Sequence, residues 1–398
     1  MTRPDSADVR AHLLRLAKRH PRLMELRTVM TTAQGRPIDA VTVTDPTVHA
    51  RHKQHALFVA GQHGNEESAR LIALALLDHL LSPAGRLTLR RQKIVVMPNV
   101  SPDAAENDSY TTPAGIKPNL DHGPDGATSP EGKAVETIAR ELEPELFVDI
   151  HARGHAGCSY DMVLYPPTRV YTEDDNLLRA IAAEMAKAGA RAGVPNITHP
   201  LTWPGWGSDD LNQPSTTCFA YRQFKSIVLL TETCEHNDVA YPASLRAKCG
   251  LARLTTLLAW GNRRHPCFSQ SGYPCGLAAG MFWCGAMAVG ADAAQRRRSR
   301  IELWQHVGGF KTLAPVLPED AAKKVVKIEY DGPPLKHGVG ILMRAAGRRQ
   351  VKSVRADGRK LGRGAVDGYQ SWHDGPSTFV VAALPTLAAG EHRIEARF

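Results

Sequence analysis

The chain lacks several features that would assign it to a class of protein at once. No apolar run in its 398 residues approaches the roughly 18 uninterrupted residues that a membrane-spanning helix needs. The N-terminus, Met-Thr-Arg-Pro-Asp, has none of the apolar stretch of a secretory signal. With 43% hydrophobic and 22% charged residues, the composition is that of a soluble globular protein. We therefore expect no membrane partner.

Cysteine also gives no framework for the fold. The seven cysteines include no CxxC pair and no zinc-ribbon spacing, and an odd number cannot all pair within one chain. We expect buried, reduced thiols in a cytoplasmic protein, although Cys267, Cys275 and Cys284 are close enough in sequence for one disulfide. A secreted form from which the signal had been removed would have the same sequence.

The positive charge is unevenly distributed. Residues 266–398 hold 19 Lys+Arg and 11 Asp+Glu, so +8 of the net +9 belongs to the C-terminal third. No groove of basic residues interleaved with aromatics accompanies this excess, and we interpret the arginines at 296–300 as a solvated or interdomain surface. We expect no nucleic-acid partner.

Residues 1–265 show short apolar strands that alternate with helices. This pattern predicts an α/β fold with a mostly parallel or mixed sheet covered by helices on both faces. The expected strands are 38–43, 56–60, 94–97, 146–150 and 227–230, and the expected helices are 6–20, 67–81, 131–142, 174–191 and 243–260.

The C-terminal part has a different pattern of expected secondary structure. Five strand-like runs without helices predict an all-β sandwich at residues 320–398, after a connector at 266–319. In the first domain, the polar stretch 99–130 is too long for a simple connection, so we expect it to be functional.

Two strand ends carry candidate metal ligands. His63 and Glu66 follow the strand 56–60 in a glycine-flanked turn, and His151 directly follows the strand 146–150. Ligands gather at the carboxyl ends of parallel strands, and two histidines with a carboxylate leave zinc an open position for water. An HxxE pair alone often arises by chance on a surface. Together the three residues predict one zinc ion per chain.

A third strand end carries a carboxylate. Glu232 ends the apolar strand that begins at Ile227, where a charge is costly unless it is used or paired. Beside zinc it would serve as general base and acid. Glu235 competes for the same role.

These motifs make residues 8–262 resemble the zinc metallocarboxypeptidases of the carboxypeptidase A type, whose superfamily includes the aspartoacylase and succinylglutamate desuccinylase deacylases. The resemblance implies that His63, Glu66 and His151 bind zinc and that Glu232 is catalytic. The matching segments, in the family's order, are 34–38, 61–66, 98–103, 129–131, 149–151, 207–210 and 230–233.

The sequence departs from the family in the binding pocket. Where the family has Asp-Leu-Asn-Arg, whose Asn and Arg bind the terminal carboxylate, this chain has Asp121 and His122 in the last two positions. Arg153 is a candidate for polarising the scissile carbonyl or else a surface arginine. Trp206 and Asp209 occupy the loop that lines the family's specificity pocket, although Asp209 would serve equally as a capping residue.

The sequence thus predicts a zinc-dependent hydrolase that cleaves an amide bond and has an atypical carboxylate pocket. The substrate would be a peptide-like or acylated small molecule. Two alternatives remain open: an N-acyl amino acid deacylase or esterase using the same zinc chemistry, and a non-enzymatic zinc- or glycan-binding protein.

Overall fold

The computed structural model divides the chain into two compact units, Met1–Asn262 and Arg263–Phe398. The residues that the structure describes are 4–48, 53–153, 158–165, 172–200, 213–224, 226–235, 241–261, 310–312, 323–330, 333–334, 339–364, 367–374 and 377–398.

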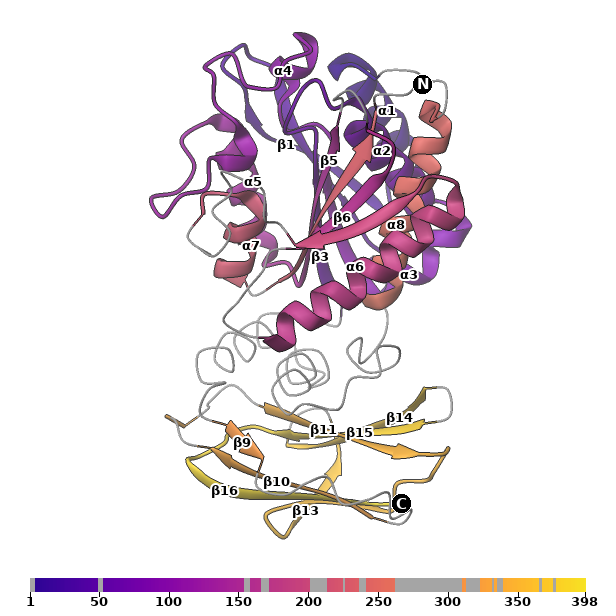
Figure 1. Cartoon of the computed structure of the whole chain (residues 1–398), viewed down its shortest axis with the longest axis vertical. Helices are drawn as coiled ribbons and strands as arrows, with labels where there is room; N and C mark the ends of the chain where they lie inside the picture. The colour runs from indigo at the N-terminus through magenta and orange to yellow at the C-terminus, as the bar shows by residue number, and fades with distance from the viewer. Residues whose placement is uncertain are drawn as a thin grey trace. The chain divides into compact units, whose positions relative to one another are not determined.

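A mixed eight-stranded sheet forms the centre of the first unit (Figure 1). The strand order is β1-β2-β4-β3-β5-β8-β6-β7, in which β4, β3, β5 and β8 run parallel and β1, β2 and β6 join antiparallel to their inner neighbours. The strands are β1 Met24–Thr31, β2 Pro37–Val43, β3 Gln54–Ala60, β4 Gln92–Met97, β5 Leu146–Arg153, β6 Asp161–Tyr165, β7 Asn196–Pro200 and β8 Ile227–Cys234.

Helices cover both faces of this sheet. Figure 1 shows α5 and α7 on one side and α2, α6 and α8 on the other. The central strands between these layers are fully buried, with Phe58, Val148 and Leu229 at 0% exposure, as expected for parallel strands covered twice. The helices are α1 Ser6–Arg19, α2 Glu67–Leu81, α3 Arg86–Arg91, α4 Pro102–Glu106, α5 Pro130–Leu142, α6 Thr172–Ala192, α7 Thr216–Phe224 and α8 Ala243–Gly261, with 3-10 turns at Pro83–Gly85 and Pro118–Leu120.

The predicted α/β class is confirmed, and every strand and helix expected in the first unit is present. Six of its strands and helices were not predicted: β1, β6, β7, α3, α4 and α7. Within the described residues no single helix is long and apolar enough to cross a membrane; only α2 taken together with Pro83–Arg91, bent by 79° between them, meets the criteria of length and composition.

The cysteine expectation needs correction. Cys158 and Cys234 are joined by a disulfide, with their Cα atoms 5.7 Å apart, instead of being reduced. Their separation of 76 residues left no spacing signal in the sequence, because only the pairing of neighbouring strands brings them together. The predicted alternative among Cys267, Cys275 and Cys284 lies outside the described residues.

The described residues of the second unit form strands in two layers, as the predicted sandwich requires. One layer is β11-β15-β14 and the other is β12-β16-β10-β9, and β13 pairs with both β12 and β14 (Figure 1). β9 lies in the segment assigned to the connector. The strands are β9 Phe310–Thr312, β10 Lys323–Tyr330, β11 Val339–Ala346, β12 Ser353–Ala356, β13 Arg359–Arg363, β14 Gly368–Asp374, β15 Ser377–Leu384 and β16 Gly390–Arg397.

Cations stand opposite one another on one face of the second layer. The opposed pairs are Lys323 with Arg397, Lys327 with Arg393, and Arg355 with Lys360. Between them Glu395 binds Lys323, Arg393 and Arg397 at 3.1, 3.3 and 2.8 Å. Although burial favours the protonated carboxyl, these bonds lower the pKa of Glu395 to about 2. We call these seven residues the basic face.

Candidate metal centre

Glycines shape the loop that follows β3. Gly61 adopts a positive φ of 65°, and a Cβ atom on Gly64 would lie 2.0 Å from the backbone of Ala104. The amides of Val100 and Ser101 donate to the carbonyls of Ala60 and Gly61 at 3.0 and 2.9 Å. Only glycine permits this turn and close approach, so the loop presents the next residues from a fixed backbone.

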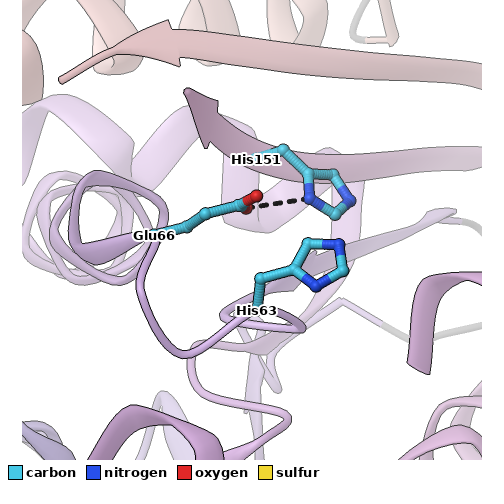
Figure 2. Close-up of side chains that lie close together, drawn as sticks. All are labelled: His63, Glu66 and His151. Atoms are coloured by element: carbon cyan, nitrogen blue, oxygen red, sulfur yellow. Dashed lines mark hydrogen bonds and ion pairs between the residues drawn. The ribbon is translucent and has the colours of Figure 1, made fainter. Parts of the chain in front are cut away.

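His63 lies in this loop with its ring almost fully buried (Figure 2). Its Nδ1 lies 2.7 Å from the carbonyl oxygen of Tyr110, whose ring stacks on the imidazole at 3.8 Å. Nδ1 therefore carries the proton, and Nε2 is left with a lone pair. Among the described residues that buried Nε2 has no hydrogen-bond partner. Burial, His151 and Lys117 lower the pKa of His63 to about 3.

Glu66 stands at the N-cap position of α2 but turns its carboxylate toward the end of β5. Its Oε2 lies 2.9 Å from Nδ1 of His151 and accepts the amide of Ala152 at 3.1 Å (Figure 2). Burial raises the pKa of this carboxyl. Through these two contacts Glu66 links the loop after β3 to the end of β5.

His151 is held from its other side by a second carboxylate. Its Nε2 lies 3.0 Å from Oδ1 of Asp149, and that carboxylate accepts a 2.6 Å hydrogen bond from Gln62. Burial opposes a charge on the ring, yet Asp149 and Glu66 together raise the pKa of His151 well above its usual value. A carboxylate on the far nitrogen of a metal-binding histidine fixes the ring's tautomer and orientation.

These three side chains fit a zinc ion. Each offers one ligand atom, and the three atoms lie within 4.8 Å of one another. Two imidazoles and a carboxylate are a typical ligand set for catalytic zinc, and the unpartnered Nε2 of His63 supplies a free lone pair. The buried carboxyl groups of Glu66 and Glu232 would also be stabilised by a nearby divalent cation.

Glu232 lies directly beside His151, because the two residues pair in the register of β5 and β8. The residue as a whole is partly exposed, whereas its Oε2 is buried and has no hydrogen-bond partner among the described residues. Burial, followed by the nearby charge of Glu66, raises the pKa of Glu232 to about 8. A carboxyl group with such a pKa can both accept and donate a proton near neutral pH.

Glu235, the alternative catalytic carboxylate, has a different environment. Its Oε1 accepts the backbone amide of Ser68 in the first turn of α2. Burial raises its pKa to about 7. A carboxylate engaged with the start of a helix is poorly placed to act on substrate.

Arg153 stands two residues beyond His151 at the end of β5. Its Nη2 donates to the carbonyl of Tyr160, and its guanidinium lies 5.0 Å from the centre of the Tyr160 ring. Arg153 is close enough to Glu232 to lower the pKa of that carboxyl slightly against the effect of burial. It therefore contributes positive charge to this edge of the sheet.

The predicted pocket residues Asp121 and His122 are engaged within the fold. Asp121 accepts the backbone amides of Thr128 and Ser129, just before α5. His122 has 0% exposure, and its Nδ1 lies 3.2 Å from Oε1 of Glu136. The remaining two, Trp206 and Asp209, lie outside the described residues.

Sequence reasoning did not assign roles to Asp149 and Gln62. Asp149 precedes His151 by two residues on a strand, so the period of two puts both side chains on one face. The sequence spacing therefore already indicated that Asp149 lies on the same face as His151. Gln62 contacts Asp149 from 87 residues away, and nothing in the local sequence indicates this contact.

A family model described as zinc carboxypeptidase matches residues 9–118, the segment that contains His63 and Glu66. Solved metallocarboxypeptidases superpose on about two thirds of the chain. The fold is that of the metallocarboxypeptidases. The metallo-carboxypeptidase from Burkholderia cenocepacia is 21% identical, over 64% of this chain and 68% of its own, with a TM-score of 0.53.

Two further metallocarboxypeptidases show the same likeness. The carboxypeptidase A from Helicoverpa armigera is 16% identical, with 65% of this chain and 74% of its own covered and a TM-score of 0.54. The metallo-carboxypeptidase from Pseudomonas aeruginosa, solved with (2-guanidinoethylmercapto)succinic acid, is 21% identical over 63% and 68%, with a TM-score of 0.51. No curated protein matches the sequence.

Proposed function

We propose that the chain is a zinc-dependent hydrolase that cleaves an amide bond in a peptide-like substrate. The observation that carries this proposal is the convergence of His63, Glu66 and His151 at one edge of the sheet, with Glu232 in register beside them. These three residues would hold zinc, which when bound would supply a Lewis acid for the scissile carbonyl.

Glu232 acts as the general base and then as the general acid. Its carboxylate takes a proton from the attacking water while the oxygen bonds to the carbonyl carbon. It returns the proton to the nitrogen as the carbon–nitrogen bond breaks, so no other co-reactant is needed. Burial and the nearby charge of Glu66 raise the pKa of Glu232, which favours a residue that holds the proton between the two steps. Asp149 keeps the His151 ring in one orientation throughout.

The substrate we propose is not an ordinary peptide C-terminus. The position where the family's arginine would bind the terminal carboxylate is the buried His122, which is bonded to Glu136. This departure favours a modified peptide or an N-acyl compound. Comparing turnover of short peptides with that of N-acyl amino acids distinguishes the two.

Metal analysis tests the ligand assignment. We expect one zinc per chain in the wild type and its loss in His63→Ala and His151→Ala, since two ligands make an incomplete site. His79→Ala serves as the matched control, because His79 is a partly buried histidine on α2 that lies outside the cluster. Full zinc content in both ligand variants would overturn the assignment.

A further inference from the structure

The start of α2 has an unusual feature at its N-cap. An N-cap side chain ordinarily accepts the backbone amide of the second or third helical residue, here Ser68 or Ala69. Glu66 occupies the N-cap position but makes no such bond. Its carboxylate is bonded instead to His151 and Ala152.

Glu235 accepts the amide that Glu66 leaves free. The backbone N–H of Ser68 donates to Oε1 of Glu235, which lies 167 residues further along the chain. Glu235 is itself fixed at its backbone, because its amide donates to the carbonyl of Arg153 at 2.9 Å and its carbonyl accepts from Arg246 at 3.2 Å. A carboxylate at a helix N-terminus is also favoured by the helix dipole.

We propose that Glu235 is a positioning residue for the metal: by capping α2 from the end of β8, it leaves the carboxylate of Glu66 free to face His63 and His151. The amide of Ser68 is the donor that Glu66 would otherwise take as N-cap. Without Glu235, the carboxylate of Glu66 is drawn back to its own helix and away from the metal. The inference rests on the ligand assignment proposed above.

The test compares three substitutions at Glu235 by zinc dissociation constants, measured in competition with a chelator. Glu235→Ala removes the acceptor, and we expect zinc to bind about 10- to 100-fold more weakly, as for other residues that orient ligands. Glu235→Gln keeps an amide oxygen that can accept the same N–H, so it should bind zinc within about threefold of wild type. Glu235→Asp keeps the charge but withdraws the acceptor, so it should be weaker than Glu235→Gln; this variant also serves if the alanine variant does not fold.

Asp5→Ala is the matched control. Asp5 caps α1 in the same unit by accepting the amide of Asp8 at 2.7 Å, and it is not a member of the metal cluster. Both alanine variants lose a helix cap, which typically costs about 1 kcal/mol of stability. Under our proposal only Glu235→Ala weakens zinc binding.

Three results would overturn the proposal. These are wild-type zinc affinity in Glu235→Ala, an equal loss in Asp5→Ala, and a Glu235→Gln variant as weak as Glu235→Ala, which would make charge rather than capping responsible. The ligand assignment fails separately. If His63→Ala keeps its zinc, the assignment is wrong; if it loses zinc while Glu235→Ala binds normally, only the positioning role is wrong.

Discussion

Amidating the C-terminus of a peptide substrate should change its hydrolysis by less than about tenfold. Under our proposal, His122 stands where the resembled family has the arginine that binds a free carboxylate, and its side chain is fully buried against Glu136. Its neighbour Asp121 is an acid occupied by two backbone amides before α5. Neither side chain is in a position to stabilise a negative charge on the substrate.

The magnitude follows from the missing bond. A hydrogen bond to a charged group contributes about 1.5–3 kcal/mol, and an enzyme with such a clamp would favour the free acid by about 10- to 150-fold. The assay measures kcat/KM for one peptide with a free C-terminus and for the same peptide amidated. We expect a ratio below about 10, because no equivalent bond forms.

A strong preference for the free acid would refute this reasoning. One of two cations near the metal centre would then bind the substrate carboxylate. These are Arg153 and Lys117, and Nζ of Lys117 lies 5.1 Å from the ring of Tyr110 that stacks on His63. Loss of the preference in Arg153→Ala or Lys117→Ala would identify the substitute clamp. Lys133→Ala, an exposed lysine on α5, is the control.

Three further predictions concern catalysis and stability. Glu232→Gln should retain zinc and lose about 100-fold or more in kcat, because an amide cannot accept the proton of water; single-turnover rates check this. Glu395 has its pKa lowered from 4.5 to about 2 in the fold, so its carboxylate stabilises the second unit above pH 4.5 and that stability is lost as the pH falls toward 2. When melting temperatures are measured as the pH is lowered, the Glu395→Gln variant should not show this loss of stability. Arg253→Met should destabilise the first unit by about 3–5 kcal/mol in urea, since it removes the cation that lies 2.9 Å from the buried carboxylate of Asp161 and leaves that charge with a backbone amide alone. The exposed ion pair of Arg27 with Glu141 is the comparison, and Arg27→Met should lower the free energy of unfolding by less than about 1 kcal/mol.

The strands that carry the metal centre could be predicted because their signal is local. β3, β5 and β8 are continuous apolar runs, each ending close to a histidine or carboxylate. Two of the strands that were missed, β1 and β7, carry weaker patterns. β7 alternates between partly buried and exposed residues at the edge of the sheet, and β1 is largely exposed after Met24, so neither has a fully buried face that would show as a row of apolar residues.

The residues around the centre depend on contacts that no local pattern encodes. Asp121 and His122 were placed in the substrate pocket by resemblance, whereas their partners come from the start and interior of α5. Glu232 was preferred to Glu235 from the sequence because it ends the apolar strand, whereas its register beside His151 and the bond from Ser68 to Glu235 were not predicted. Both are properties of the assembled fold.

The opposed cations of the basic face make the second unit dependent on dissolved ions. Like charges directly across a strand pair repel, and strands lie only about 4.8 Å apart, well within the Debye length of about 8 Å at 0.15 M salt. Glu395 compensates part of this repulsion, and the rest is left to counterions that gather above the sheet. Adding salt weakens most surface ion pairs, but here it should screen more repulsion than attraction. The melting temperature of this unit is therefore expected to rise with ionic strength.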